Sequence, residues 1–548
     1  MTVRPLTILA AAVALTGLNA VKPAVVDDTA YLFFARHLAE QPLDPYGWQL
    51  FWYDAPQPAM QILLPPVLPY WLAVGIRLFG EHLFLLKLWL FPFAWLLCGA
   101  VAALLARFGS GAERPLSLVF VCSPAVLPLF NVMLDIPALS LGAAAVAMFV
   151  AGLDRRQLRL CAAAGVLAGL AMQTKYSMLV TPVVMALYAV LVVGSWRSLA
   201  ALVVAGVAAL AVFGGWELSV FAAHGESHFW HHFTASSEEE GGLMRRFAFA
   251  KPLLIQFGGL ACGLSLVAGR AAGWPAWVRV AGGAFVVALF AAVAVVPFRR
   301  VVITGTLDAT YLGFLACGGS VVVTVGMLTA RTWNRLGWRR DTLFLMAWVA
   351  VETLAMLGMT PFPAARRLVG VHLAVLVLVA HGIGAARAGV DRWAVAVAVA
   401  VGGFVFAVDC WDAYPEKVLV ERAAECVRPA DGETVWYTGH WGFQYYAERH
   451  AMRAIEPTTR VRVGDWLVLP VIPRDGEFYR PNPPDPDWPK AGMAVELVTV
   501  LTWDDGLSAQ TLPNLYGGAV PVRGRNHPRL TVAVYRLTAA WPHPTGGR

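Results

Sequence analysis

Two adjacent carboxylates follow the first apolar stretch of the chain, in the segment VVDDTAYLFFARHLAEQ. On a helix beginning here, Asp27, Tyr31 and Phe34 would share one face, with Asp28 beside it. An ionisable side chain at the end of a membrane-crossing segment is a candidate functional group, and a carboxylate placed there could act as a general base. Solvation or capping of the helix end is the structural alternative.

Four more charged side chains are expected near the same membrane face. Asp135 in NVMLDIPALSL and Lys175 in MQTKYSML lie at turns between apolar runs, and Arg366 and Arg367 in TPFPAARRL end a later turn. Basic side chains of this kind can bind a phosphate, which arginine contacts with two parallel hydrogen bonds. Turn formation by aspartate and snorkelling by lysine or arginine are the structural alternatives.

The most polar loop between apolar runs is residues 221–250, FAAHGESHFWHHFTASSEEEGGLMRRFAFA. On a helix, His228 and His232 could share one divalent metal ion, although their spacing specifies no third ligand. The pair Gly241–Gly242 would suit a mobile lid. The neighbouring pair Arg245–Arg246 could contact an anion. The sequence therefore supplies only two of the ligands that a metal site needs.

The elements that position these residues must lie in a membrane. The 548 residues are 58% hydrophobic and 14% charged, with mean hydropathy +0.61. Soluble domains carry about 25% charged residues, so the composition indicates a polytopic membrane protein. The net charge of +7 is explained by basic loops on one membrane face, and no nucleic-acid-binding module is visible. Neither a Walker A motif nor a dinucleotide-binding glycine motif is present, which disfavours nucleotide ligands.

Apolar runs of about 20 residues predict a mainly helical integral membrane protein with about 13 spans. The predicted spans lie near residues 5–24, 83–106, 115–133, 136–153, 159–176, 178–195, 198–220, 251–269, 276–297, 309–330, 342–360, 367–386 and 392–409.

The distribution of arginine orients these spans, because cytoplasmic loops are enriched in basic residues. With the N terminus in the cytoplasm, nearly every predicted inner turn is basic, and the odd number of spans places the C-terminal segment outside. The pairs Arg299–Arg300 and Arg366–Arg367 run against this trend. The stretch Met60–Gly80 fits the pattern only as a helix lying at the outer interface, since Pro65, Pro66 and Pro69 break its first half. The expected location is the inner (plasma) membrane, crossed many times.

The expected domains are a transmembrane domain over residues 1–409, with a first outer loop at 22–82, and a small extracytoplasmic α+β domain over 410–548. In the latter, ETVWYTG, DWLVLPVI, AVELVTVLTW and RLTVAVYRL alternate as strands do, and YPEKVLVERAAECV indicates a short helix. Cys410 and Cys426 could form a disulfide there if the region lies outside the cytoplasm.

Five segments, in this order, resemble a known family. They are VVDDTAYLFFARHLA, PPVLPYWLAVGIRLFG, LDIPALSLGAAAVAMF, GLAMQTKYSMLV and PFPAARRLVGVHLAVLVLVA. Together they resemble the protein O-mannosyltransferase and aminoarabinose-transferase group of the GT-C superfamily of polytopic glycosyltransferases. The resemblance covers most of residues 1–410. It implies the GT-C fold and transfer of a sugar, with inversion, from a polyprenyl-phosphate donor.

The resemblance also implies roles for individual residues. The acidic pair of the family's first outer loop corresponds to Asp27–Asp28, and its key aspartate to Asp27. Asp135 matches the acidic position after the third span, and Lys175 matches the Thr-Lys segment. Ala30 stands where the aminoarabinose transferases have an arginine, and MQILLPPVLPYW lacks their lysine. Because both basic residues are associated with phosphate binding, this chain must contact its donor phosphate differently, and lipid A is not implied as the substrate.

The hypothesis from the sequence assigns catalysis to Asp27 and Asp28, with Asp27 as the base. Asp135 and Tyr31 would orient it or bind the acceptor. Lys175, Arg366 and Arg367 would bind the donor phosphate. Four aromatic residues could stack on sugars or anchor the protein at the interface: Trp48, Trp52, Tyr53 and Trp230.

The expected partners are a polyprenyl-phosphate-sugar donor, the lipid bilayer and a cell-envelope acceptor. The main alternative is a multi-span transporter or lipid flippase that transfers no sugar. A non-catalytic sensor or assembly subunit, whose outer domain binds a partner, is a third interpretation.

Overall fold

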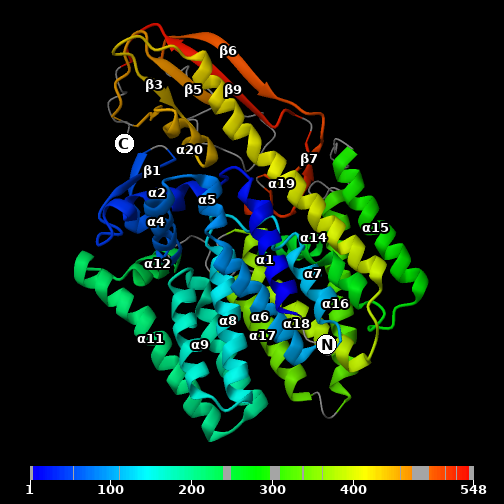
Figure 1. Cartoon of the computed structure of the whole chain (residues 1–548). Helices are drawn as coiled ribbons and strands as arrows, with labels where there is room; N and C mark the ends of the chain where they lie inside the picture. The colour runs from blue at the N-terminus through cyan, green and yellow to red at the C-terminus, as the bar shows by residue number, and fades with distance from the viewer. Residues whose placement is uncertain are drawn as a thin grey trace.

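The computed structural model describes residues 4–541, except 54, 110, 238–247, 296–308, 336–338, 361, 457, 472–492, 513 and 526. Long helices form a bundle, and a β-sheet lies across one end of it beside the helix that begins at Asp28 (Figure 1). We call this the Asp27 end of the bundle. Three pairs singled out in the sequence lie outside the described residues: Gly241–Gly242, Arg245–Arg246 and Arg299–Arg300.

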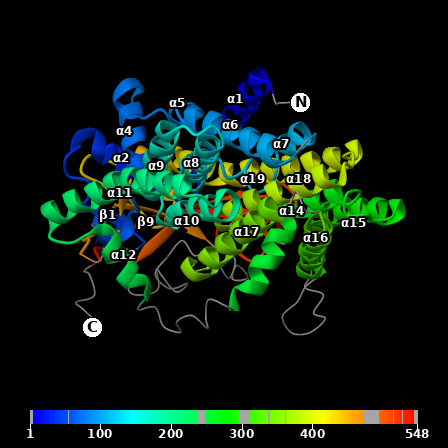
Figure 2. The ribbon, with the colours of Figure 1, turned by 90° about the horizontal axis from the view of Figure 1, so that it is seen from below.

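Ten helices of the described chain are long and apolar enough to cross a membrane, so the protein is a multi-pass membrane protein. The helices at predicted positions are α1 (Pro5–Ala20), α5 (Leu83–Leu88) with α6 (Phe91–Phe108), α8 (Asp135–Asp154), α9 (Leu158–Met172), α10 (Val180–Tyr188), α11 (Trp196–His224), α14 (Ala250–Ala268), α15 (Ala276–Val295), α16 (Ala309–Trp333), α17 (Arg339–Met359), α18 (Val369–Ala386) and α19 (Arg392–Cys426). Seen from below, α9 and α11 lie toward one side of the bundle and α15 and α16 toward the other (Figure 2).

One predicted span is not a single helix. Helix α7 covers only Glu113–Val121, and residues 122–134 continue as buried turns. Pro124 and Pro128 explain the difference, because proline lacks the N–H that a continuing helix needs and its ring clashes with the preceding turn. The prediction of one helix over 115–133 is therefore wrong.

The last membrane helix is longer than predicted. Helix α19 runs through 35 residues with Pro415 inside it, so the short helix predicted after residue 409 is its continuation. Cys410 and Cys426 are both free cysteines on this one helix. Sixteen positions along a helix separate their Cα atoms by about 24 Å, whereas a disulfide needs less than about 7 Å. The disulfide considered from the sequence is therefore excluded.

The segment after α1 folds against the Asp27 end. It contains α2 (Asp28–Glu40), the hairpin of β1 (Gln49–Trp52) and β2 (Ala55–Pro58), the short α3 (Ala59–Ile62) and α4 (Val67–Phe79). Helix α4 packs against α2. The predicted break at Pro65 and Pro66 separates α3 from α4. Pro69 does not break the chain as predicted, because it lies in the first turn of α4, where no backbone N–H donor is needed. At 13 residues, α4 is too short to span a bilayer, which agrees with the interfacial interpretation.

The C-terminal region contains a five-stranded sheet in the order β4-β3-β5-β9-β6. Its strands are β3 (Val435–Tyr437), β4 (Arg453–Ala454), β5 (Trp466–Val471), β6 (Val495–Trp503) and β9 (Leu530–Leu537). Strands β3, β5, β6 and β9 coincide with the four predicted strands. Helix α20 (Gly442–Arg449) follows β3, and a separate pair joins β7 (Ala509–Gln510) to β8 (Arg523–Gly524). Most buried apolar residues of this region, among them Leu515 and Val534, share one continuous core with the helix bundle.

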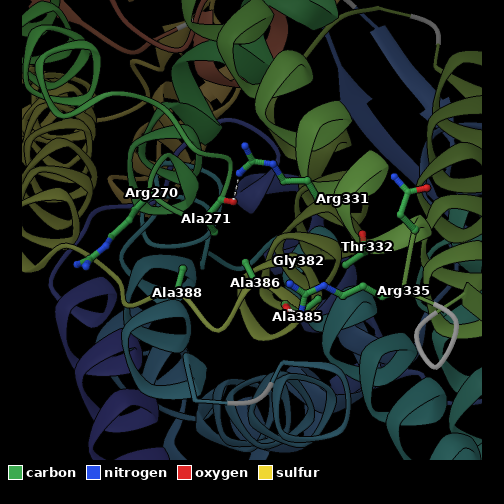
Figure 3. Close-up of a pocket in the computed structure, with 10 residues that line it drawn as sticks. Arg270, Ala271, Arg331, Thr332, Arg335, Gly382, Ala385, Ala386 and Ala388 are labelled. Atoms are coloured by element: carbon green, nitrogen blue, oxygen red, sulfur yellow. Dashed lines mark hydrogen bonds between the residues drawn. The ribbon is translucent and has the colours of Figure 1, made fainter.

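The opposite end of the bundle gathers arginine side chains predicted for inner loops. Arg270, Arg331 and Arg335 line a cavity of about 460 Å³ between the ends of α14, α16 and α18 (Figure 3). Arg331 donates a hydrogen bond of 2.7 Å to the carbonyl oxygen of Ala271, and Arg335 donates one to that of Ala385. These cations lie on helix C-terminal carbonyls, where positive charge is favoured. These arginines thus lie at the end of the bundle opposite the Asp27 end.

Helix α19 crosses the turn after α7 at backbone contact. A Cβ atom added at Gly402 would lie 1.5 Å from the carbonyl oxygen of Cys122, whereas one added at Gly403 would meet nothing within 4 Å. Only glycine fits at the first position, because any side chain would push the helix away from the turn.

Gly402→Ala is therefore expected to destabilise the protein by about 1–3 kcal/mol, the usual cost of overpacking. The matched variant Gly403→Ala, one position along the same helix, should be neutral or slightly stabilising because alanine is the better helix former. Thermal unfolding of both purified variants in the same detergent measures the difference. Equal melting temperatures for the two variants would contradict the packing described here.

Candidate functional site

The backbone that presents Asp27 is constrained from several directions. Val26, just before it, has φ 47°, a left-handed conformation that a β-branched residue rarely adopts. The N–H of Ala24 donates a 2.8 Å hydrogen bond to the hydroxyl of Tyr446 in α20. Asp27 occupies the N-cap position of α2, yet its side chain makes no capping hydrogen bond. Capping therefore does not explain Asp27, and its carboxylate faces other partners. Strained backbone of this kind is common at functional sites.

The neighbouring Asp28 is buried and fastens this segment. Its carboxylate accepts a 3.2 Å hydrogen bond from the N–H of Val25 and lies 3.5 Å from the ammonium of Lys87. Lys87 also donates to the carbonyl oxygens of Lys22 and Pro23, at 2.8 and 3.1 Å. Burial raises the pKa of Asp28, while the charges of Lys87 and Lys22 act in the opposite direction. Asp28 therefore lies beneath the site rather than in it.

Asp27 forms an ion pair with Arg366, which lies in the 3-10 turn Ala365–Leu368 that leads into α18. Their side chains are 22% and 11% exposed, so the pair remains open to solvent on the carboxylate side. A guanidinium in contact favours the ionised carboxylate, which is the form that can accept a proton. The structure thus brings together two residues that stand 339 positions apart.

A second ion pair lies next to the first. Asp135, the first residue of α8, pairs with Lys175, which follows α9. Arg366 and Arg367 both lie close enough to Asp135 to interact electrostatically with its carboxylate. The side chains of four segments therefore meet at the Asp27 end, as their placement in the sequence predicts.

Arg367 is the uncommitted cation of the group. Its guanidinium lies over the ring of Phe362, with 4.3 Å from Cζ to the ring centroid. Within the described chain it forms no ion pair, and its buried Nε has no hydrogen-bond partner. Three cations against two carboxylates leave this group, which we call the charged cluster (Asp27, Asp135, Lys175, Arg366 and Arg367), with one net positive charge.

Two tyrosines border the charged cluster. Burial raises the pKa of Tyr31 well above its ordinary value, and the charge of Asp27 adds to the shift. The pKa of Tyr53 is raised for the same two reasons. Both phenols therefore keep their protons and act as hydrogen-bond donors or acceptors rather than as bases.

The C-terminal region contributes a side chain that sequence reasoning missed. His440, in the turn between β3 and α20, is fully buried and contacts Trp52 and Tyr53 of the first hairpin, at 4.1 and 4.4 Å between ring centroids. The charge of Asp27 acts on the pKa of His440. In the sequence, TGHWGF gives only a turn signal, because a contact nearly 390 residues away leaves no local pattern.

No model of a protein family matches the chain, and no curated protein matches it in sequence. The chain is similar to solved structures of membrane glycosyltransferases. One is ArnT from Cupriavidus metallidurans bound to undecaprenyl phosphate, with 14% identity over 96% of this chain and 97% of that chain, and a TM-score of 0.44. Another is the oligosaccharyltransferase AglB from Archaeoglobus fulgidus, with 13% identity over 82% of this chain and 64% of that chain, and a TM-score of 0.48.

The histidine pair predicted from the sequence lies on one helix face, but its ring nitrogens contact protein groups. His228 and His232 of α12 (His228–Ser237) have their Nε2 atoms 3.2 Å apart, and both contact the carbonyl oxygen of Leu63. Nδ1 of His228 lies 2.5 Å from the hydroxyl of Tyr176. Burial lowers the pKa of His228 to about 2. Among the described residues no group of three metal-ligating side chains occurs, and these histidines join α12 to the loop before α4.

The remaining aromatic candidates are placed differently from Trp52 and Tyr53. Trp48 stacks on His37 with 4.6 Å between ring centroids, which holds the loop before β1 on α2. Trp230 of α12 is exposed and stacks on Phe233. Exposure of an indole at this level suits an anchor in the headgroup region.

Proposed function

We propose that this protein is a membrane glycosyltransferase that moves a sugar from a polyprenyl-phosphate donor to a cell-envelope acceptor, with inversion. The observation that carries the proposal is the charged cluster: two carboxylates and three cations from distant segments meet at one end of a membrane helix bundle. Such a site can take a proton and stabilise a phosphate in one place. The segments that supply these residues are the ones that resemble the GT-C glycosyltransferases.

The reaction needs one base and one anion site. The acceptor hydroxyl oxygen attacks the anomeric carbon, its proton passes to the carboxylate of Asp27, and the bond from that carbon to the phosphate oxygen breaks. The donor leaves as polyprenyl phosphate, which carries one more negative charge than before. Protonation neutralises Asp27 in the same step, so the positive charge of Arg366 is no longer balanced by Asp27 when the departing phosphate gains negative charge. Arg366 is therefore suited to couple proton transfer to the departure of the phosphate.

The other charged residues divide into two roles. Arg367, and Lys175 from the far side, bind the donor phosphate before the reaction, since Arg367 has no carboxylate of its own. Asp135 holds Lys175 in place and can accept a hydrogen bond from the acceptor, with Tyr31 nearby as a neutral hydrogen-bonding group. Asp28 acts as a positioning residue through Lys87, which donates hydrogen bonds to the carbonyl oxygens of Lys22 and Pro23, shortly before Asp27.

We place the Asp27 end at the outer membrane face and the N terminus in the cytoplasm. The support is the arginine distribution: the cations predicted for inner loops gather at the opposite end, around the cavity of Figure 3. A lipid-linked donor suits an outer site, because nucleotide-activated sugars stay in the cytoplasm. The plasma membrane is the expected location.

A reconstitution experiment tests the function. The purified protein in liposomes would be incubated with a panel of polyprenyl-phosphate sugars and an envelope extract, and free polyprenyl phosphate would be measured. Its release, dependent on Asp27, supports sugar transfer. Movement of the intact donor across the bilayer without cleavage would instead identify a flippase, and neither result for any donor would remove both interpretations.

Arg367→Gln is expected to raise the apparent KM for the donor roughly 10- to 100-fold, because it removes a charge-assisted contact with the phosphate. The value of kcat should change far less, since Arg366 and Lys175 remain. The matched control Arg462→Gln removes an exposed arginine of the C-terminal region and should leave both constants unchanged. An unaltered donor KM in Arg367→Gln would exclude the proposed phosphate contact.

A further inference from the structure

His440 has one ring nitrogen that nothing in the described structure uses. Its Nδ1 lies 2.9 Å from Oε1 of Gln444, while Nε2 is buried and has no hydrogen-bond partner. The side chain as a whole is 0% exposed. Buried polar atoms are nearly always hydrogen-bonded, because leaving one without a partner costs about 1–3 kcal/mol. Nε2 of His440 is therefore able to accept a hydrogen bond from a bound molecule.

The tautomer of His440 follows from its neighbours. Nε2 of Gln444 donates to the carbonyl oxygen of Phe51 and to the carboxylate of Glu448, both at 3.2 Å. Because both are acceptors, the Gln444 amide can only be oriented with Oε1 toward His440. Nδ1 of His440 must then carry the proton. Burial lowers the pKa of His440 to about 4, so the ring is neutral at pH 7, and Nε2 presents a lone pair that can accept a hydrogen bond.

The two segments that meet at His440 are both held in uncommon backbone conformations. Trp441, the next residue, has φ 60°, and Tyr53 has φ 62°. Gly439, on the other side of His440, has φ 119°. Non-glycine residues with positive φ are uncommon and cost of order 1 kcal/mol or more, and they cluster where a precise orientation is needed.

The surroundings of Nε2 suit a carbohydrate. The Trp52 ring stands nearly perpendicular to the imidazole, at 86°, and the Tyr53 ring is tilted at 47°. Aromatic faces pack against the apolar C–H faces of sugars, whose hydroxyl groups then need acceptors at the edge. The charge of Asp27 acts on both Tyr53 and His440, so these side chains lie near the charged cluster.

Ordinary packing is the competing explanation, since a buried histidine can simply fill space. It leaves three features without a cause: the polar atom without a partner, the fixed tautomer that aims a lone pair, and the uncommon backbone on both sides. A phenylalanine would fill the same volume without the cost of burying Nε2.

We propose that Trp52, Tyr53 and His440 form a carbohydrate subsite, in which Nε2 of His440 accepts a hydrogen bond from a sugar hydroxyl. The subsite rests on the proposed function, and it gives the C-terminal region a direct part in substrate recognition. The hydroxyl belongs either to the transferred sugar or to a sugar of the acceptor, and the chemistry recognised is the same in both cases.

The first experiment measures binding by NMR and does not require enzymatic activity. Protein labelled with ¹⁵N-histidine in detergent micelles would give the signals of His440, assigned by their loss in His440→Gln. Methyl glycosides of common pentoses and hexoses, at tens of millimolar, serve as acceptor-type probes, and polyprenyl-phosphate sugars serve as donors. We expect a proton on Nδ1 alone and a shift of the Nε2 resonance on addition of one of these classes, which identifies the source of the hydroxyl. A proton on Nε2, or no shift with either class, overturns the proposal.

Kinetics of variants supplies the second measurement. His440→Phe should raise the KM for the sugar-bearing substrate roughly 3- to 10-fold, as expected for one neutral hydrogen bond, with kcat little changed. Its melting temperature should fall, because Oε1 of Gln444 loses its hydrogen-bond donor. His440→Gln, which can accept the same bond, should recover part of the loss. The control His450→Phe, at the exposed end of α20, should have no effect. Equal loss in His440→Phe and His440→Gln would show a purely structural role.

The two measurements separate this proposal from the proposed function. Glycoside binding at His440 without any sugar transfer would reject the enzyme assignment and keep the subsite. Sugar transfer with an unperturbed His440 would keep the enzyme and reject the subsite.

Discussion

Asp27→Asn is expected to lower kcat for sugar transfer by roughly 100- to 10,000-fold, the range that a general base contributes. Asparagine has nearly the same size and cannot take the acceptor proton at neutral pH. The substitution also removes the carboxylate that pairs with Arg366. Because the Asp27 side chain is 22% exposed, water can replace part of that contact, and the free energy of unfolding should change little. Initial rates of polyprenyl phosphate release from reconstituted protein measure the effect.

Glu40→Gln is the matched control, because it neutralises an exposed carboxylate at the other end of the same helix. Its rate should equal that of the unaltered protein. Donor binding should survive in Asp27→Asn, and with one carboxylate fewer beside Arg366 it should be equal or tighter. Transfer at the normal rate by a well-folded Asp27→Asn protein would show that another group takes the proton.

The residues of the charged cluster were largely predictable, because the number of membrane spans decides on which side of the membrane each helix end lies. Once apolar runs and arginine-rich turns fix which end of each helix faces which side, Asp27, Asp135, Lys175 and the pair Arg366–Arg367 must share one end. That argument cannot give pairings. The contact of Asp27 with Arg366, and of Asp135 with Lys175, depends on which helices are neighbours, and helix neighbours leave no periodic signal in a single sequence.

Local signals failed where tertiary packing overrode them. The sequence predicted a span ending at residue 409 and a separate short helix after it, yet α19 continues through both, with Pro415 inside it. Conversely, Pro124 and Pro128 did end a helix inside a run that is apolar enough to span. Proline removes one hydrogen bond in both cases. Whether the chain breaks there depends on what surrounding segments supply, and the sequence does not show this.

The proposed role of His440 was the least predictable from the sequence. Its importance comes from an atom without a partner and from backbone angles at Tyr53 and Trp441, none of which a residue pattern encodes. A histidine in a glycine-flanked turn is unremarkable until the first hairpin is placed against it.

Lys22→Met is expected to lower the free energy of unfolding by about 3–5 kcal/mol, the cost of leaving a buried charge without its partner. Lys22 and Asp409 form an ion pair with both side chains 0% exposed. Lys22 also donates to the carbonyl oxygen of Pro128 at 3.0 Å and to the hydroxyl of Tyr516 at 2.9 Å. The network thus joins the end of α1, the turn after α7, helix α19 and the C-terminal region. Chemical or thermal unfolding in detergent measures the change.

Lys417→Met is the matched control on α19. Lys417 pairs with Glu421 at 3.9 Å, and the two side chains are 41% and 40% exposed, so its loss should cost less than about 1 kcal/mol. The double variant Lys22→Met/Asp409→Leu should be more stable than Lys22→Met alone, because it removes the uncompensated carboxylate. Additive losses in the double variant would show that the two residues act independently.

The Lys22 network also bears on the candidate site, because Lys22 lies five residues before Asp27 and its carbonyl oxygen accepts a hydrogen bond from Lys87, the partner of Asp28. Loosening Lys22 should therefore let the strained turn at Val26 relax and misplace Asp27, the proposed base. We expect Lys22→Met to reduce kcat at temperatures well below its melting point. Gly402→Ala, which also destabilises the protein but acts on α19 and the turn after α7, should keep kcat near normal until it unfolds. This comparison separates positioning of Asp27 from loss of folded protein.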